Sequence, residues 1–129
     1  MEIRPIGVVR SVQGEVSEIE IAPQLADGLF RLEENEKILV LFLFDRSEGF
    51  ELKVHPRGDI NNPLVGVFAS RSPRRPNPIG ATVVKLLEVR GNVLTVSGLD
   101  AWEGTPVVDI KPDRRRNGLE LGRSMVKTN

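Results

Sequence analysis

A seven-residue apolar run, ILVLFLF at residues 38–44, constrains the fold more than any other stretch of this sequence. It is the longest apolar run in the chain, yet far shorter than the roughly 20 residues of a membrane-spanning helix. Its length suits a β-strand, and the lack of polar alternation is typical of a strand covered on both faces. We therefore expect residues 37–44 to form a central, fully covered strand, and we expect no membrane association.

The other apolar segments are also short, and turn residues separate them. Residues 17–22 alternate polar and apolar side chains, which is the period-two pattern of a half-buried strand. Residues 81–89 and 93–96 flank an Arg-Gly-Asn turn and predict a tight hairpin. Further strands are expected at residues 3–10, 50–55, 64–70 and 106–110.

Only residues 23–32 favour a helix, because a proline opens the segment and three leucines follow at helical spacing. Gly28 limits that helix to two or three turns. Seven or eight short strands with one short helix indicate an all-β fold, a small closed or partly open β-barrel. The alternating helices of a Rossmann fold are missing. We expect one barrel domain over residues 1–112 and a basic C-terminal tail over residues 113–129.

Composition excludes several kinds of site. The chain has no cysteine and a single histidine, so disulfides, thiolate metal sites, cysteine nucleophiles and imidazole clusters are absent. We predict no metal site. The N-terminus lacks the pattern of a signal peptide, and we expect a cytoplasmic protein.

The net charge is zero, but the charge is unevenly distributed along the chain. Residues 1–52 contain 5 Lys and Arg against 11 Asp and Glu, whereas residues 53–129 contain 13 against 7. One surface could therefore face nucleic-acid phosphates. Pairing between the acidic and basic halves explains the same numbers, and charge alone leaves both interpretations open.

An arginine- and proline-rich segment, SRSPRRPNPIG, follows the apolar residues 64–69. Proline fixes the backbone, so this loop is stiff without strand pairing. Arginine suits phosphate and carboxylate groups and stacks on purines. Gly80 is expected to let the backbone turn into the next strand. The segment predicts a binding loop, although a rigid surface connection with solvated arginines is the alternative.

Two further stretches place polar groups where strands end. The segment SGLDAWEGTPVVDIKP, residues 97–112, carries carboxylates beside glycines, and Trp102 offers a stacking face. Such groups can bind ribose hydroxyls or an amino group, but they are equally common in turns. Asp45 and Arg46 follow the long apolar strand and form a weaker candidate.

These segments together resemble the TsaA-like (TrmO) family of tRNA methyltransferases. The resemblance rests on FASRSPRRPNPIG and SGLDAWEGTPVVDIKP, with PIGVVRS and ILVLFLFDRSEGF in support, and covers most of residues 3–112. It implies a β-barrel that binds S-adenosylmethionine near a homodimer interface. It also implies N6-methylation of threonylcarbamoyl-adenosine next to the anticodon, in the anticodon loop of tRNA.

The resemblance implies a cofactor site on three segments of this chain. Its residues would be Asp45, Arg46, Arg71, Ala81, Ser97, Gly98, Leu99 and Asp100. We expect a set of arginines to hold RNA phosphates: Arg74, Arg75, Arg114, Arg115 and Arg116. No catalytic residue is assigned.

One departure from the family favours an alternative function. Longer family members carry a proline-arginine-glutamine loop after the first strand, where this chain has the shorter, acidic SVQGEVSEIEIAPQ. The alternatives are a non-catalytic S-adenosylmethionine-binding module and an RNA-binding barrel.

Overall fold

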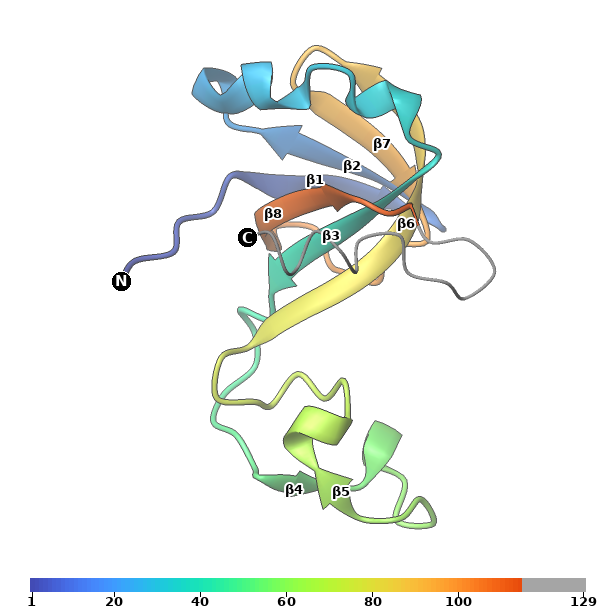
Figure 1. Cartoon of the computed structure of the whole chain (residues 1–129). Coiled ribbons are helices and arrows are strands. Elements are labelled where there is room, and N and C mark those ends of the chain that lie inside the picture. Colours follow the sequence, from blue (N-terminus) through green and yellow to red (C-terminus); the bar gives the residue numbers. More distant parts are fainter. Residues whose placement is uncertain (115–129) are drawn as a thin grey trace.

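Six antiparallel strands close into a barrel in the computed structural model, which describes residues 1–114 (Figure 1). Around the barrel the order is β1-β2-β7-β6-β3-β8. The bounds are β1 Gly7–Gln13, β2 Val16–Ile21, β3 Lys37–Leu43, β6 Ile79–Arg90, β7 Val93–Ser97 and β8 Pro106–Pro112. The expected all-β barrel is confirmed, and closure leaves these six strands without a free edge.

The barrel interior is filled by aliphatic side chains that alternate along every strand. Twelve buried residues form one core cluster: Val9, Ile19, Ile21, Leu29, Ile38, Val40, Phe42, Val84, Leu94, Val96, Leu99 and Val107. The predicted hairpin is confirmed, since β6 and β7 pair up to Arg90 with Val93 across a turn that contains Gly91.

The long apolar strand β3 is covered less completely than its sequence predicts. Ile38, Val40 and Phe42 are buried inside the barrel, whereas the residues between them point outward and are only half-buried. The prediction of a strand fully covered on both faces is therefore wrong. β3 instead pairs with β6 on one side and β8 on the other.

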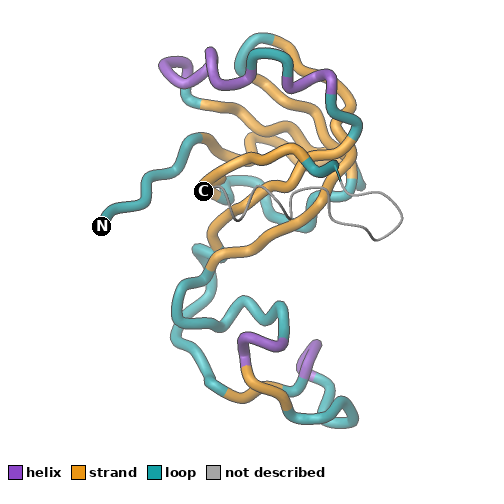
Figure 2. The backbone as a smooth tube through the Cα atoms, in the orientation of Figure 1, coloured by secondary structure: helices purple, strands orange, loops and turns teal. Residues whose placement is uncertain are grey.

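The predicted helix over residues 23–32 forms as two short 3₁₀ segments that lie beside the end of the barrel (Figure 2). η1 spans Pro23–Leu29 and η2 spans Leu32–Glu34. Between them Arg31 adopts φ 67°, a left-handed backbone that interrupts any continuous helix. Leu29 from η1 joins the barrel core.

Residues 44–78 leave the barrel and form a projecting arm between β3 and β6 (Figures 1 and 2). The arm contains β4 (Lys53–Val54) and β5 (Val65–Gly66), which pair with each other, and the 3₁₀ turns η3 (Pro56–Gly58) and η4 (Val67–Ala69). The strands predicted at residues 50–55 and 64–70 are therefore mostly loop. Prolines and the absence of a third strand limit the pairing to two residues on each side.

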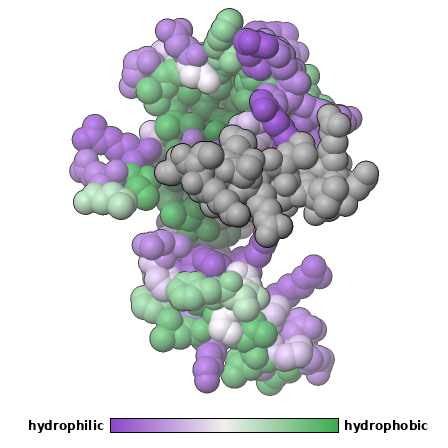
Figure 3. Space-filling view, in the orientation of Figure 1, coloured by the Kyte–Doolittle hydropathy of each residue, from purple (hydrophilic) through white to green (hydrophobic). Residues whose placement is uncertain are grey.

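The arm exposes large apolar side chains, which appear as green areas on the lower lobe of Figure 3. They are Phe50, Leu52, Ile60, Leu64 and Phe68, here called the arm patch. Few residues cover the patch because the arm is too small to build a core of its own.

The described chain ends just beyond the barrel. The backbone N–H of Asp113 donates to the carbonyl of Lys37 at 3.1 Å, which continues the pairing of β8 with β3. Residues 115–129, most of the predicted tail, lie outside the described residues. None of the helical segments within residues 1–114 has the length and apolar character needed to cross a membrane.

Candidate functional site

A pocket of about 400 Å³ lies where the rim of the barrel meets the base of the arm. Four segments contribute to it: the end of β3, the start of the arm, the arginine-proline loop and the turn between β7 and β8. The lining residues are Phe42, Leu43, Phe44, Asp45, Arg46, Ser47, Pro73, Asp100, Ala101, Trp102 and Thr105.

Two aromatic rings contribute to the wall of this pocket: Phe42 of β3 and Phe44, which directly follows that strand. Phe42 and Phe44 meet edge to face, with ring centroids 5.3 Å apart and an interplanar angle of 72°. Gly80, on the neighbouring strand β6, leaves the space that these rings occupy, because a Cβ there would lie 2.6 Å from Phe42 Cζ. A residue without a side chain at position 80 therefore lets the two rings pack. The prediction that Gly80 forms a sharp turn is wrong, because Gly80 lies within β6 and pairs with Phe42 of β3.

The charged groups of the pocket lie at its rim. Asp45, Arg46 and Asp100 are exposed, and among the lining residues they are the only charged ones. The guanidinium of Arg46 lies 4.3 Å from the ring centroid of Trp102, and its Nη2 donates to the carbonyl of Glu103 at 3.2 Å. Two anions and one cation thus surround an apolar wall.

The predicted segment 97–100 leads the chain from β7 to the pocket. Gly98 adopts φ 94°, a conformation that favours glycine, and its N–H donates to the carbonyl of Glu15 at 2.9 Å. Leu99 is buried in the barrel core, so its side chain anchors the turn. Asp100 lines the pocket, whereas Ser97, Gly98 and Leu99 do not.

Arg71 and Ala81, which were predicted to lie in one site, are in direct contact. Arg71 Nη1 donates to the carbonyl of Ala81 at 3.0 Å, and this bond ties the arginine-proline loop to β6. Neither residue lines the pocket, but Pro73 of the same loop does. The structure therefore brings Asp45, Arg46 and Asp100 together around one pocket. Arg71 and Ala81 lie outside the lining and are linked to it by Pro73, which belongs to the same loop as Arg71.

Two of the predicted RNA-binding arginines have partners within the arm. Arg74 Nη1 lies 3.3 Å from a carboxylate oxygen of Glu51. Arg75 Nη1 donates to the carbonyls of Ser70 and Ser72, at 3.0 and 3.1 Å, and so helps to hold the loop in shape. Arg74 is exposed, whereas Arg75 is partly buried.

Of the predicted tail arginines, only Arg114 is described. Arg114 is exposed. The pKa of Glu34 is lowered mainly by the hydrogen bond from Arg31, and the positive charge of Arg114 lowers it further. Arg115 and Arg116 lie outside the described residues. Within residues 1–114, no three His, Cys, Asp or Glu side chains gather closely enough to hold a metal ion.

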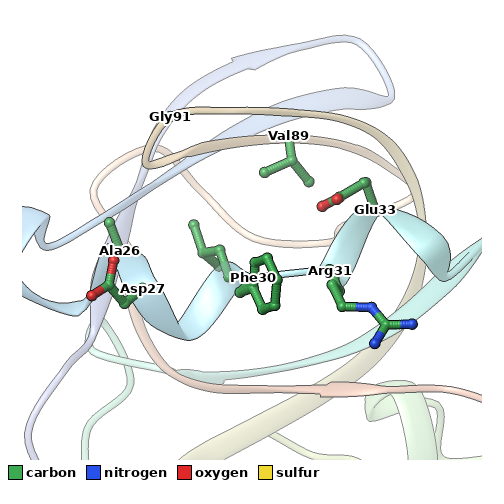
Figure 4. A pocket seen from close by; sticks show the side chains of 8 residues that line it. Ala26, Asp27, Phe30, Arg31, Glu33, Val89 and Gly91 are labelled. Atoms are coloured by element: carbon green, nitrogen blue, oxygen red, sulfur yellow. The ribbon is translucent and has the colours of Figure 1, made fainter.

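A second hollow, of about 560 Å³, lies between the 3₁₀ segments and the β6–β7 hairpin (Figure 4). It is more open, and Phe30, Arg31 and Val89 are among the residues around it. None of the residues predicted to bind cofactor or RNA lines this hollow.

Sequence reasoning missed part of the pocket. Phe42 and Ser47 were not selected, because each is ordinary for a strand end or a loop, and Pro73 and Thr105 lay in the selected stretches without being assigned to the site. Thr105 lies next to a turn glycine and is almost fully buried. Only the closure of the barrel, which brings β3 beside β8, places it near Phe42.

Comparison with known proteins identifies relatives over almost the whole described chain. The family model described as tRNA-methyltransferase O N-terminal domain (TrmO_N) matches residues 7–116. A crystal structure of TrmO from Pseudomonas aeruginosa superposes with a TM-score of 0.69 at 28% identity. That match covers 93% of this chain and 60% of the other, so the chain spans about three fifths of that protein.

Two curated relatives differ in length and in name. A probable S-adenosyl-L-methionine-binding protein from Methanocaldococcus jannaschii is 45% identical over 113 residues, covering 84% of this chain and 89% of that protein. A tRNA (adenine(37)-N6)-methyltransferase from Mus musculus is 44% identical over 87 residues, covering 66% of this chain but 20% of that protein.

Proposed function

Because this chain belongs to the tRNA-methyltransferase O (TrmO) family, we propose that it binds S-adenosylmethionine and transfers the methyl group to tRNA. The observation that carries the proposal is the pocket at the rim of the barrel, where three residues expected to contact the cofactor lie together. They are Asp45, Arg46 and Asp100. The resemblance seen in the sequence motifs is confirmed by the family match.

The charges of the pocket complement those of the proposed cofactor. S-adenosylmethionine carries a sulfonium and an ammonium, both positive, and one carboxylate. The pocket offers two carboxylates and one guanidinium at its rim, beside an aromatic wall. Its volume of about 400 Å³ falls within the roughly 300–1,000 Å³ of small-molecule sites. These residues therefore fit the cofactor in charge, and the pocket fits it in size.

Each predicted segment has a role in this proposal. Arg46 binds the carboxylate of the methionyl tail, and Asp45 and Asp100 bind its ammonium or the ribose hydroxyls. Arg71 and Ala81 hold the arginine-proline loop against β6 so that Pro73 closes one side of the pocket. Ser97, Gly98 and Leu99 fix the backbone that carries Asp100.

Bound S-adenosylmethionine supplies an electrophilic methyl group on sulfur. The protein must align that methyl with a weak amine nucleophile, and pre-organised alignment lowers the barrier by several kcal/mol. Rim carboxylates placed at the ammonium or the ribose avoid stabilising the sulfonium in the ground state. Asp109 is a poor candidate for the base, because its carboxylate accepts from the backbone of Ile110 and lies 3.3 Å from Lys111 Nζ.

We further propose that the substrate is threonylcarbamoyl-adenosine next to the anticodon, methylated on N6. The name of the mouse relative, a tRNA adenine N6-methyltransferase, supports this position and atom. Anticodon-loop phosphates would be held by Arg74 and Arg75, which follow the pocket residue Pro73 in the sequence, and by Arg114 to Arg116, which follow β8 in the sequence. In this proposal residues 1–112 form the catalytic domain and residues 113–129 a basic tail.

The protein is proposed to act as a homodimer in which the arm patch of each chain is buried. A cluster of five large apolar side chains on so small an arm is typical of a protein interface. The base of the same arm contributes residues 44–47 and Pro73 to the pocket, so dimerisation through the arm would fix the element that carries them.

A second candidate function is a non-catalytic S-adenosylmethionine-binding module. One specific observation favours it: the archaeal relative of similar length is named a probable binding protein, not a methyltransferase. This candidate predicts cofactor binding without methyl transfer.

The experiment that separates the two candidates uses tRNA from a strain that lacks this protein. The purified full chain is incubated with that tRNA and methyl-labelled S-adenosylmethionine, and labelled nucleosides are identified by mass spectrometry. We expect label on N6 of threonylcarbamoyl-adenosine. Cofactor binding with no label on tRNA would favour the binding module, and absence of cofactor binding would reject both.

A further inference from the structure

We propose that Trp102 positions Arg46 so that its guanidinium binds the carboxylate of the methionyl tail. This inference rests on the proposed function, because it concerns the same pocket. Trp102 is thus assigned as a positioning residue that acts through Arg46 and does not hold the adenosyl part of the ligand.

Two contacts orient the Arg46 side chain. Its guanidinium lies over the indole face, 4.3 Å from the ring centroid, and Nη2 donates to the carbonyl of Glu103 at 3.2 Å. An arginine over a tryptophan ring is held by cation–π attraction. Because only one N–H of the guanidinium is bound to Glu103, other donors stay available for a bidentate bond to a carboxylate.

The turn that carries the indole is itself fixed to the barrel. The N–H of Thr105 donates to the carbonyl of Trp102 at 3.0 Å, which closes the turn. Gly104, with φ 92°, donates to the carbonyl of Val9 in β1 at 2.7 Å. Trp102 is 65% exposed, so little of the indole is needed for the core. Its backbone is anchored and its ring is free to support Arg46.

Arg46 needs such support because, in the described part of the chain, only the Glu103 carbonyl also contacts its guanidinium. No carboxylate within residues 1–114 forms an ion pair with it. It is also the only cation that lines the pocket, and Asp45 precedes it directly in the sequence. Without the indole, the long side chain would sample many rotamers, and ordering it on binding would cost more free energy.

The ligand series that tests the proposal separates the two ends of the cofactor. S-adenosylhomocysteine has the amino-acid tail, whereas 5′-methylthioadenosine has the same adenosyl sulfur without carboxylate or ammonium. Calorimetric titration measures Kd for both ligands with wild type, Trp102→Ala, Trp102→Phe and Phe30→Ala. Phe30 is the matched control, since it is an exposed aromatic residue remote from the pocket.

We expect Trp102→Ala to raise the Kd for S-adenosylhomocysteine about three- to tenfold, the range of a partly exposed cation–π contact. The Kd for methylthioadenosine should change less than about twofold. Trp102→Phe retains a ring face and should recover most of the affinity, and Phe30→Ala should match wild type. In an Arg46→Ala background, Trp102→Ala should cause no further loss, because the two residues act as one unit.

Equal losses for both ligands, or a loss that persists without Arg46, would overturn the proposal, since Trp102 would then contact the adenosyl part. Wild-type binding of S-adenosylhomocysteine with an unchanged Kd in Trp102→Ala would reject the positioning role alone. No binding of either ligand by wild type would instead reject the proposed function.

A readout without ligand checks the contact itself. Trp102 is the only tryptophan and the chain has no tyrosine, so its emission dominates the fluorescence of the protein. Arg46→Ala should shift or brighten that emission relative to wild type, and Arg4→Ala should not. An unchanged spectrum in Arg46→Ala would contradict the stacked arrangement.

Discussion

Gly80 on β6 lies so close to Phe42 on β3 that a Cβ atom at Gly80 would be 2.6 Å from Phe42 Cζ. The same atom would be 2.9 Å from Cζ of Phe44. Both rings line the candidate pocket, so the absence of one side chain on β6 fixes the shape of that wall. Packing inside the barrel and the geometry of the site are therefore coupled at Gly80.

Replacing Gly80 with alanine should distort the aromatic wall and weaken ligand binding. Overpacking a filled site of this kind costs about 1–3 kcal/mol of unfolding free energy. Urea denaturation measures the loss of stability, and titration with S-adenosylhomocysteine measures the loss of affinity. Gly28→Ala is the control: its Cβ would meet no atom within 4 Å, so we expect a neutral effect. Equal stability of the two variants would show that the rings move aside freely.

Removing the Arg71 side chain should loosen the arginine-proline loop. Arg71→Ala deletes the hydrogen bond to the carbonyl of Ala81, which links that loop to β6. We expect the Kd for S-adenosylmethionine to rise at least threefold, consistent with the loss of one charged hydrogen bond. Arg90→Ala removes an arginine that is 84% exposed on the β6–β7 hairpin and should leave Kd unchanged. Wild-type affinity in Arg71→Ala would remove Arg71 from the site.

Binding of an anticodon-loop RNA should depend steeply on salt if arginines of the arm contact phosphates. For single-stranded RNA each phosphate contact adds about 0.7 to the slope of log K against log salt. Arg74→Ala should reduce the slope by about that amount. Arg4→Ala, which removes an exposed arginine near the N-terminus, should not. A slope that is flat in wild type would exclude phosphate contacts by these arginines.

A charge placed in the arm patch should dissociate the proposed homodimer. Phe68 is 79% exposed, and Phe68→Asp would bring a carboxylate into an apolar interface. Sedimentation equilibrium should give a dimer for wild type and at least tenfold weaker association for this variant. Phe30→Asp makes the same change at a residue 84% exposed outside the arm and should remain dimeric. A monomeric wild type would contradict the proposal.

The barrel could be predicted from the sequence because its strands carry local signals. Alternation in residues 17–22 and the Arg-Gly-Asn turn between β6 and β7 depend only on neighbouring residues. The arm could not be predicted in the same way. Residues 64–70 are apolar enough for a strand, but only Val65 and Gly66 pair, because the arm offers a single partner strand.

The candidate site was predictable where charged residues follow the ends of strands, as at Asp45 and Asp100. The roles of Phe42 and Gly80 in the pocket wall could not be predicted, because they depend on a contact between β3 and β6, which are distant in sequence. The support of Arg46 by Trp102 likewise depends on barrel closure, which brings residues 57 positions apart, Arg46 and Glu103, into hydrogen-bonding distance.

The most direct test of the central claim is calorimetric titration of the full chain with S-adenosylmethionine, in parallel with the Asp45→Asn, Asp100→Asn double variant. We predict saturable binding by wild type, with one ligand for each chain. Removal of two negative charges from the rim should weaken binding of the cationic cofactor at least tenfold. No binding by wild type, or equal affinity in the double variant, would contradict a cofactor site at this pocket.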